Sequence, residues 1–111
     1  MEDRLRTDLW VSANVVKCNA EGMPVYITNK GAAESGTVIL KIIVSPNNCR
    51  VLNQFRSDSG EISWMDIYDG QLVSEDRAGD YIKQALDRDP DVWVLEIESR
   101  DGKNPFEGKI V

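Results

Sequence analysis

The sequence predicts an α+β fold: a five-stranded, mostly antiparallel sheet with two helices, in the order α-β-β-β-β-α-β. Two observations support this prediction. The middle of the chain contains short β-branched segments separated by turn residues, and two segments with helical spacing of apolar residues lie on either side. At 111 residues, we expect positions 1–111 to form a single globular domain, with a weakly specified tail at 104–111.

The first helix is expected over Thr7–Glu21, with Thr7 as its N-cap and Gly22 after its end. One apolar row recurs at helical spacing and is expected to face the sheet, namely Leu9, Ala13, Val16 and Ala20. A second row lies roughly opposite and consists of Val11, Val15 and Cys18, with Trp10 at its flank. A helix on a sheet needs only one apolar face, so the second row suggests burial against something else, either the rest of this chain or another copy. The alternative is that Val11 and Val15 are isolated surface residues.

Four strands are expected next, joined by short loops into a meander: Val25–Thr28, Thr37–Val44, Arg50–Phe55 and Glu61–Tyr68. The second of these is almost wholly apolar and β-branched, which is typical of a central strand covered on both faces.

The second helix is expected to begin after Ser74, which is a good N-cap residue. Its apolar stripe consists of Ala78, Tyr81, Ile82, Ala85 and Leu86. Asp89-Pro90 ends it, because the residue before a proline is disfavoured in the helical conformation. A last strand is expected over Val92–Glu98, with Trp93, Leu95 and Ile97 directed into the core.

Composition excludes several functional classes. There is no histidine and there are two cysteines, so His-based triads and Cys/His zinc sites are excluded. The N-terminus is too charged for a secretory signal, and no apolar run is long enough to span a membrane. We therefore expect a cytoplasmic protein in which Cys18 and Cys49 are reduced.

The net charge argues against nucleic-acid binding, and the residues of one motif argue against a phosphate-binding loop. The net charge of −6 makes nucleic acid an unlikely partner, although Arg4, Arg6 and Arg50 are candidates for a local basic patch. The stretch GAAESGT at 31–37 resembles a phosphate-binding loop but lacks the lysine, and a strand follows it instead of a helix. We therefore interpret its glycines as turn residues.

The stretch DPDVWVLEIESRDGK at 89–103 contains a possible catalytic cluster. On a strand, Glu96 and Glu98 share a face, with Cα atoms roughly 6.6 Å apart. With Asp101 as a further ligand and Lys103 as an electrostatic stabiliser, these residues suggest a divalent-metal-dependent phosphoester hydrolase that uses Mg²⁺ or Mn²⁺. The order of acids and lysine does not match the PD…(D/E)xK nuclease pattern. The alternative is a solvated strand face on which the glutamates pair with Lys41, Arg4 or Arg100.

Four stretches together resemble a family of short bacterial proteins, the domain-of-unknown-function family numbered 1491. They are TDLWVSA at 7–13, the KG…SG region at 30–36, Trp64-Met65 and DPDVWVLEIESRDG at 89–102. The resemblance implies a stand-alone cytoplasmic bacterial protein and supplies no activity or catalytic residue. The tail after Pro105 looks particular to this chain.

The leading functional hypothesis is therefore a small cytoplasmic binding or assembly module that self-associates through its first helix, or binds another protein there, without a cofactor. The interface residues would be Trp10, Val11, Val15 and Cys18. The metal-dependent hydrolase is the alternative.

Overall fold

A computed structural model describes residues 6–111. Its elements in chain order are α1 (Thr7–Ala20), β1 (Val25–Asn29), β2 (Val38–Ser45), β3 (Asn48–Arg56), β4 (Ile62–Asp66), α2 (Glu75–Arg88), β5 (Trp93–Glu98) and β6 (Lys109–Ile110). The α+β class and the two helices are confirmed. The expected strand count is wrong, because the tail supplies a sixth strand.

The strands are ordered β1-β5-β2-β3-β4-β6, so β5 lies between the first two strands of the expected meander. It runs antiparallel to β1 and parallel to β2, and β6 runs parallel to β4. The sheet is therefore mixed, and both the meander over the first four strands and the mostly antiparallel pairing were wrong. A connection that contains a helix can return the chain to a parallel position, which a short hairpin loop cannot do.

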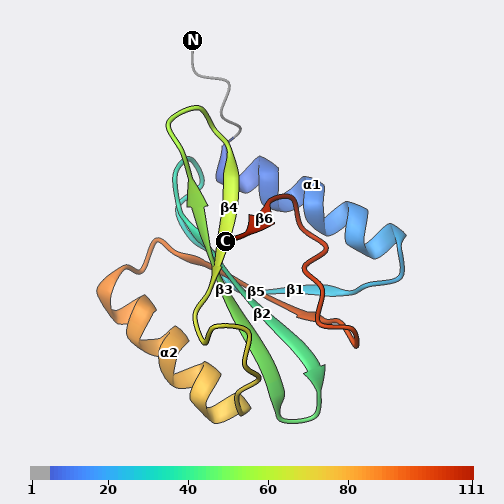
Figure 1. Ribbon diagram of the computed structural model, residues 1–111. Helices are drawn as coiled ribbons and strands as arrows, with labels where there is room; N and C mark the ends of the chain where they lie inside the picture. The colour runs from blue at the N-terminus through green and yellow to red at the C-terminus, as the bar shows by residue number, and fades with distance from the viewer. Residues whose placement is uncertain (1–5) are drawn as a thin grey trace.

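The two helices cover opposite faces of the sheet (Figure 1). Alternate residues of each central strand point to opposite faces, so Leu40 and Leu95 contribute to the core under α1, whereas Ile39 and Val94 contribute to the core under α2. This two-sided burial explains why β2 is almost wholly apolar. The side chains of Trp93, Leu95 and Ile97 point into the core under α1, as predicted.

Helix α2 matches the prediction closely. The Ser74 hydroxyl accepts a hydrogen bond of 3.1 Å from the backbone N–H of Arg77, which caps the helix. Ala78 is fully buried, and the rest of the apolar stripe packs against the same core: Tyr81, Ile82, Ala85 and Leu86.

The start of α1 differs from the prediction. Thr7 is the first helical residue and not the cap, and its buried hydroxyl donates a 2.8 Å hydrogen bond to the carbonyl of Gly36. The N–H of Asp8 donates to the carbonyl of Ala33 in the same loop. The helix is therefore anchored by the loop between β1 and β2.

That loop also approaches β5 closely. A Cβ atom on Gly31 would lie 2.1 Å from the carbonyl oxygen of Asp91, and one on Gly36 would lie 2.4 Å from the same atom. No larger residue fits at either position without a shift of the backbone. The glycines of GAAESGT therefore allow two backbone segments to touch. They flank the turn at 33–35 and are not turn residues themselves, so the interpretation as turn residues was wrong.

The C-terminal tail is held in place more firmly than the sequence suggests. Phe106 is buried against Trp10, with ring centroids 5.7 Å apart. The indole of Trp64 donates a 2.8 Å hydrogen bond to the carbonyl of Glu107, and β6 then pairs with β4. The tail thus closes one end of the core under α1.

Candidate functional site

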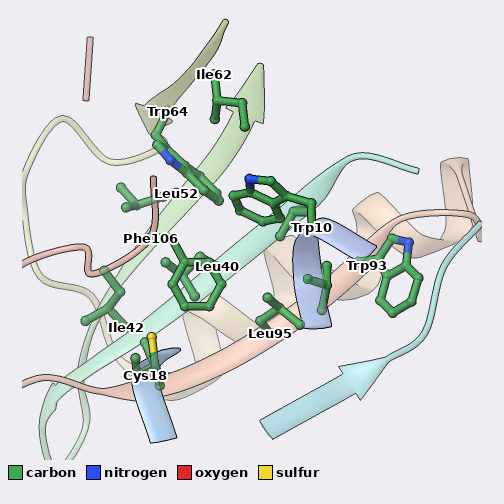
Figure 2. Close-up of a cluster of buried hydrophobic side chains, with 13 residues drawn as sticks. Trp10, Cys18, Leu40, Ile42, Leu52, Ile62, Trp64, Trp93, Leu95 and Phe106 are labelled. Carbon is green, nitrogen blue, oxygen red and sulfur yellow. The ribbon is translucent and has the colours of Figure 1, made fainter. Parts of the chain in front are cut away.

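The predicted interface residues on α1 face the core of the same chain. Trp10 is 3% exposed, Val11 and Cys18 are also buried, and Val15 is half-buried against the same cluster. Figure 2 shows Trp10 and Cys18 among the side chains between α1 and the sheet. The prediction that this row is exposed to a partner was wrong, because these bulkier side chains bury more apolar area than the other row does.

Trp10 is fixed by several contacts. Its ring centroid lies 6.1 Å from that of Trp64, and the guanidinium of Arg56 lies 5.8 Å above its ring. Its indole N–H donates a 3.2 Å hydrogen bond to the Glu107 carboxylate. Trp10 is therefore a structural residue that connects α1, β4 and the tail.

The row expected to face the sheet is the one in contact with solvent. Val16 is 69% exposed and Leu9 is 51% exposed, and Ala13 and Ala20 are exposed beside them. Sequence periodicity could not distinguish the two faces, because both are apolar. A usable signal was size, since two of the four residues in this row are alanines.

Glu96 and Glu98 lie on the sheet face that α2 partly covers. Lys41 stands opposite Glu96 in the β2–β5 register, and its ammonium forms an ion pair of 3.3 Å with Glu75. Glu98 is exposed and lines a surface hollow with Glu75 and Arg100. The two glutamates therefore share a face, as predicted, but basic side chains lie among them.

Asp101 is a turn residue. Its carboxylate accepts hydrogen bonds from the backbone N–H of Lys103 at 3.0 Å and from the Ser99 hydroxyl at 2.9 Å. These hydrogen bonds hold the pKa of Asp101 below the usual range of an aspartate.

Within residues 6–111, no three Asp, Glu, Cys or His side chains gather in a way that could hold a metal ion. The metal-dependent hydrolase with Glu96, Glu98, Asp101 and Lys103 therefore stays a prediction from sequence, without support from the geometry of the described chain.

Both cysteines are free and buried, as the sequence predicted for reduced thiols. Burial raises the pKa of the Cys18 thiol and of the Cys49 thiol above the ordinary value. A nucleophilic cysteine needs the opposite shift, toward a stable thiolate. The two thiols are therefore packing groups in this fold.

The arginines proposed for a basic patch are engaged elsewhere. Arg50 forms an ion pair of 3.0 Å with Asp66 and also donates to the carbonyl of Gly102, which ties the loop after β5 to the sheet. Arg6 forms a 3.2 Å ion pair with Asp8. Arg4 lies outside the described residues.

No helix in the described part of the chain is long and apolar enough to cross a membrane.

The fold and the contacts above define a class of small α+β protein in which one mixed sheet carries a helix on each face. The model of a protein family described as "Protein of unknown function (DUF1491)" matches residues 5–107, so the chain belongs to the DUF1491 family, as the sequence motifs indicated.

Solved structures agree with this assignment. The chain is similar to a DUF1491 family protein from Caulobacter crescentus CB15, known from a crystal structure with 30% identity, coverage of 96% of this chain and 99% of that chain, and a TM-score of 0.81. An NMR structure of a DUF1491 family protein from the same organism gives 30% identity, 96% coverage of both chains and a TM-score of 0.80.

A more distant similarity, to the solution structure of protein Atu0922 from A. tumefaciens, has 20% identity, 86% coverage of both chains and a TM-score of 0.72, and it supports the fold alone. A search of curated proteins found no match.

Proposed function

We propose that the protein is a small binding module that self-associates through the outward row of α1, defined as Leu9, Ala13, Val16 and Ala20. The single observation that carries this proposal is the exposure of this row, with Val16 at 69% and Leu9 at 51%. Its spacing is four, three and four residues, as in the apolar seam between paired helices. The opposite face of α1 already fills the core of the chain, so folding alone does not require a second apolar row.

The outward row is complementary to itself. In an antiparallel pair related by a two-fold axis, Leu9 of one copy lies opposite Ala20 of the other, and Val16 lies opposite Ala13. Each large side chain then faces a small one, so two helices can approach closely without a clash. Each of these two contacts occurs twice, once in each direction, as a two-fold interface requires.

The expected association is weak. Four side chains on a helix of 14 residues cover much less than the roughly 800 Å² per partner of a standard interface. We therefore expect dimers at high micromolar concentration and monomers on dilution. A module of this kind suits reversible assembly.

The location that we infer is the cytoplasm. Two free, buried thiols are typical of proteins that fold in a reducing compartment.

Light scattering coupled to size-exclusion chromatography tests the proposal. The wild-type mass at high micromolar concentration should approach that of a dimer, and Val16→Asp should return it to a monomer while circular dichroism stays unchanged. Asn19→Asp is the matched control, because it adds the same charge at an exposed position of α1 outside the row. A wild-type monomer throughout the concentration range, or equal dissociation by both substitutions, would overturn the proposal.

A further inference from the structure

The edge strand β1 carries a second feature, which shares only Leu9 with the outward row. β1 stands first in the strand order and pairs only with β5, so its outer edge has no strand partner within residues 6–111. Its backbone N–H and C=O groups on that side can be completed by an added extended chain. β1 also exposes an apolar side chain on each face of the sheet, with Tyr26 56% and Ile27 47% exposed.

A hollow of about 360 Å³ lies beside this edge, between α1 and β1. Its apolar lining consists of Leu9 and Val11 of α1, Ile27 of β1, Ala33 of the following loop and Trp93 of β5. Ile27 points to the α1 side of the sheet, because it pairs with Leu95. A strand added to β1 would direct every second side chain toward this hollow.

Two charged residues line the hollow, and one of them already forms an ion pair. The charged residues that line it are Asp8 and Lys30, and the Asp8 carboxylate is already paired with Arg6 at 3.2 Å. Lys30 is exposed at the end of β1, and none of the ion pairs found among the described residues involves it. A carboxylate on the added strand would complement Lys30.

We infer that β1 and the adjoining hollow bind an extended segment of another protein, with an apolar side chain in the hollow and an acidic residue beside Lys30. A second copy of this chain fits less well. Residues 23–33, which include β1, contain no Asp or Glu, so a paired copy of β1 would bring no carboxylate to Lys30.

The geometry also limits how much of β1 can contribute. The register of β1 against β5 shifts between Ile27 and Asn29. There the Thr28 hydroxyl donates to the carbonyl of Val94 in β5, and the Asn29 side-chain amide donates to the carbonyl of Val92, just before β5. Regular pairing is thus limited to Val25–Ile27. Backbone hydrogen bonds over three residues give little selectivity, so the hollow and Lys30 must supply it.

The test is a selection from phage-displayed random dodecapeptides, followed by titration of a selected synthetic peptide into ¹⁵N-labelled protein. We expect alternating apolar sequences with an Asp or Glu, and chemical-shift changes centred on the amides of Leu9 and Val25–Lys30. Ile27→Lys should weaken peptide affinity at least tenfold. Lys30→Glu should also weaken it, and replacing the acidic residue of the peptide with lysine should restore binding to that variant.

Val16→Ser is the control, because Val16 lies on the outward row and not in the hollow; it should leave peptide affinity unchanged even where it abolishes self-association. Failure to enrich any peptide, or shift changes away from β1, would overturn the inference. Concentration-dependent shifts of the β1 amides without peptide would also overturn it, since they would assign β1 to a second copy. The titration is run at low micromolar protein, where the outward row is monomeric, so neither result depends on dimerisation through Leu9.

Discussion

The indole N–H of Trp93 donates a hydrogen bond of 2.8 Å to the backbone carbonyl of Ala32. The N–H of Ala32 donates in turn to the carbonyl of Asp91, at 2.9 Å. This reciprocal contact joins the start of β5 to the loop between β1 and β2. Since the same loop anchors Thr7 of α1, three of the family-like sequence stretches meet at this point.

Trp93→Phe should lower the free energy of unfolding by about 1–3 kcal/mol, because the Ala32 carbonyl loses its donor and part of the ring volume is lost. Urea denaturation followed by circular dichroism measures the change. Tyr26→Phe removes a hydroxyl from an exposed ring and should change stability by less than about 0.5 kcal/mol. Equal effects of the two substitutions would contradict the structural role of this hydrogen bond.

Two glycine substitutions should have opposite signs. Gly36→Ala places a Cβ against the Asp91 carbonyl and should destabilise the protein by about 2 kcal/mol or more. Gly79→Ala lies on the exposed side of α2, where an added Cβ meets no atom within 4 Å, and should stabilise the protein by about 0.5–1 kcal/mol. The melting temperatures of the two variants measure these effects. A melting temperature of Gly36→Ala equal to that of the wild type would refute the close approach of Gly36 to the Asp91 carbonyl.

The observation that the Val11 face of α1 is buried and the Val16 face is exposed gives a third prediction. Val11→Ala should cost about 2 kcal/mol, because two buried methyl groups are removed from the core. Val16→Ala should leave the stability of the monomer unchanged or slightly increased, since alanine is the better helix former and the site is exposed. Chemical denaturation at low protein concentration avoids any contribution from association. The reverse ranking would indicate that Val16, and not Val11, faces the core.

The turn at Asp101 predicts a pH effect. Its pKa is lowered in the folded state by the Lys103 N–H and then by the Ser99 hydroxyl. A lowered folded-state pKa means that the stabilisation is present above the unfolded value of about 3.9 and is lost as pH falls through the folded value. The melting-temperature difference between wild type and Asp101→Asn should therefore shrink as pH falls below about 4. A difference that is constant from neutral to acidic pH would exclude this contribution.

The two thiols give a fifth prediction. Because Cys18 and Cys49 are buried and their pKa values are raised, a thiol reagent should label neither rapidly in the native protein. Both should react at once in denaturant. Labelling with iodoacetamide followed by intact mass spectrometry measures the rates, and rapid native labelling of either residue would show that its thiol is accessible.

The candidate site illustrates what a single sequence can and cannot reveal. The helical period of α1 was correct, but periodicity could not assign its two apolar rows to core and solvent, because both rows satisfy the same spacing. Glu96 and Glu98 were correctly placed on one face of β5. Lys41 was one of three basic residues expected beside them. Its position opposite Glu96 follows from the pairing of β5 with β2, which is a contact between distant segments.

The sequence by itself determined the α+β class, both helices, five strand positions close to those observed, the alternation of side chains along β5 and the family. These features depend on local propensity and on alternation along one segment, which neighbouring residues specify. Only the tertiary structure decided the insertion of β5 between β1 and β2, the sixth strand, the orientation of α1 and the hollow beside β1. Each of these depends on which distant segments bury the most apolar area together, a free energy that the periodicity of one segment does not encode.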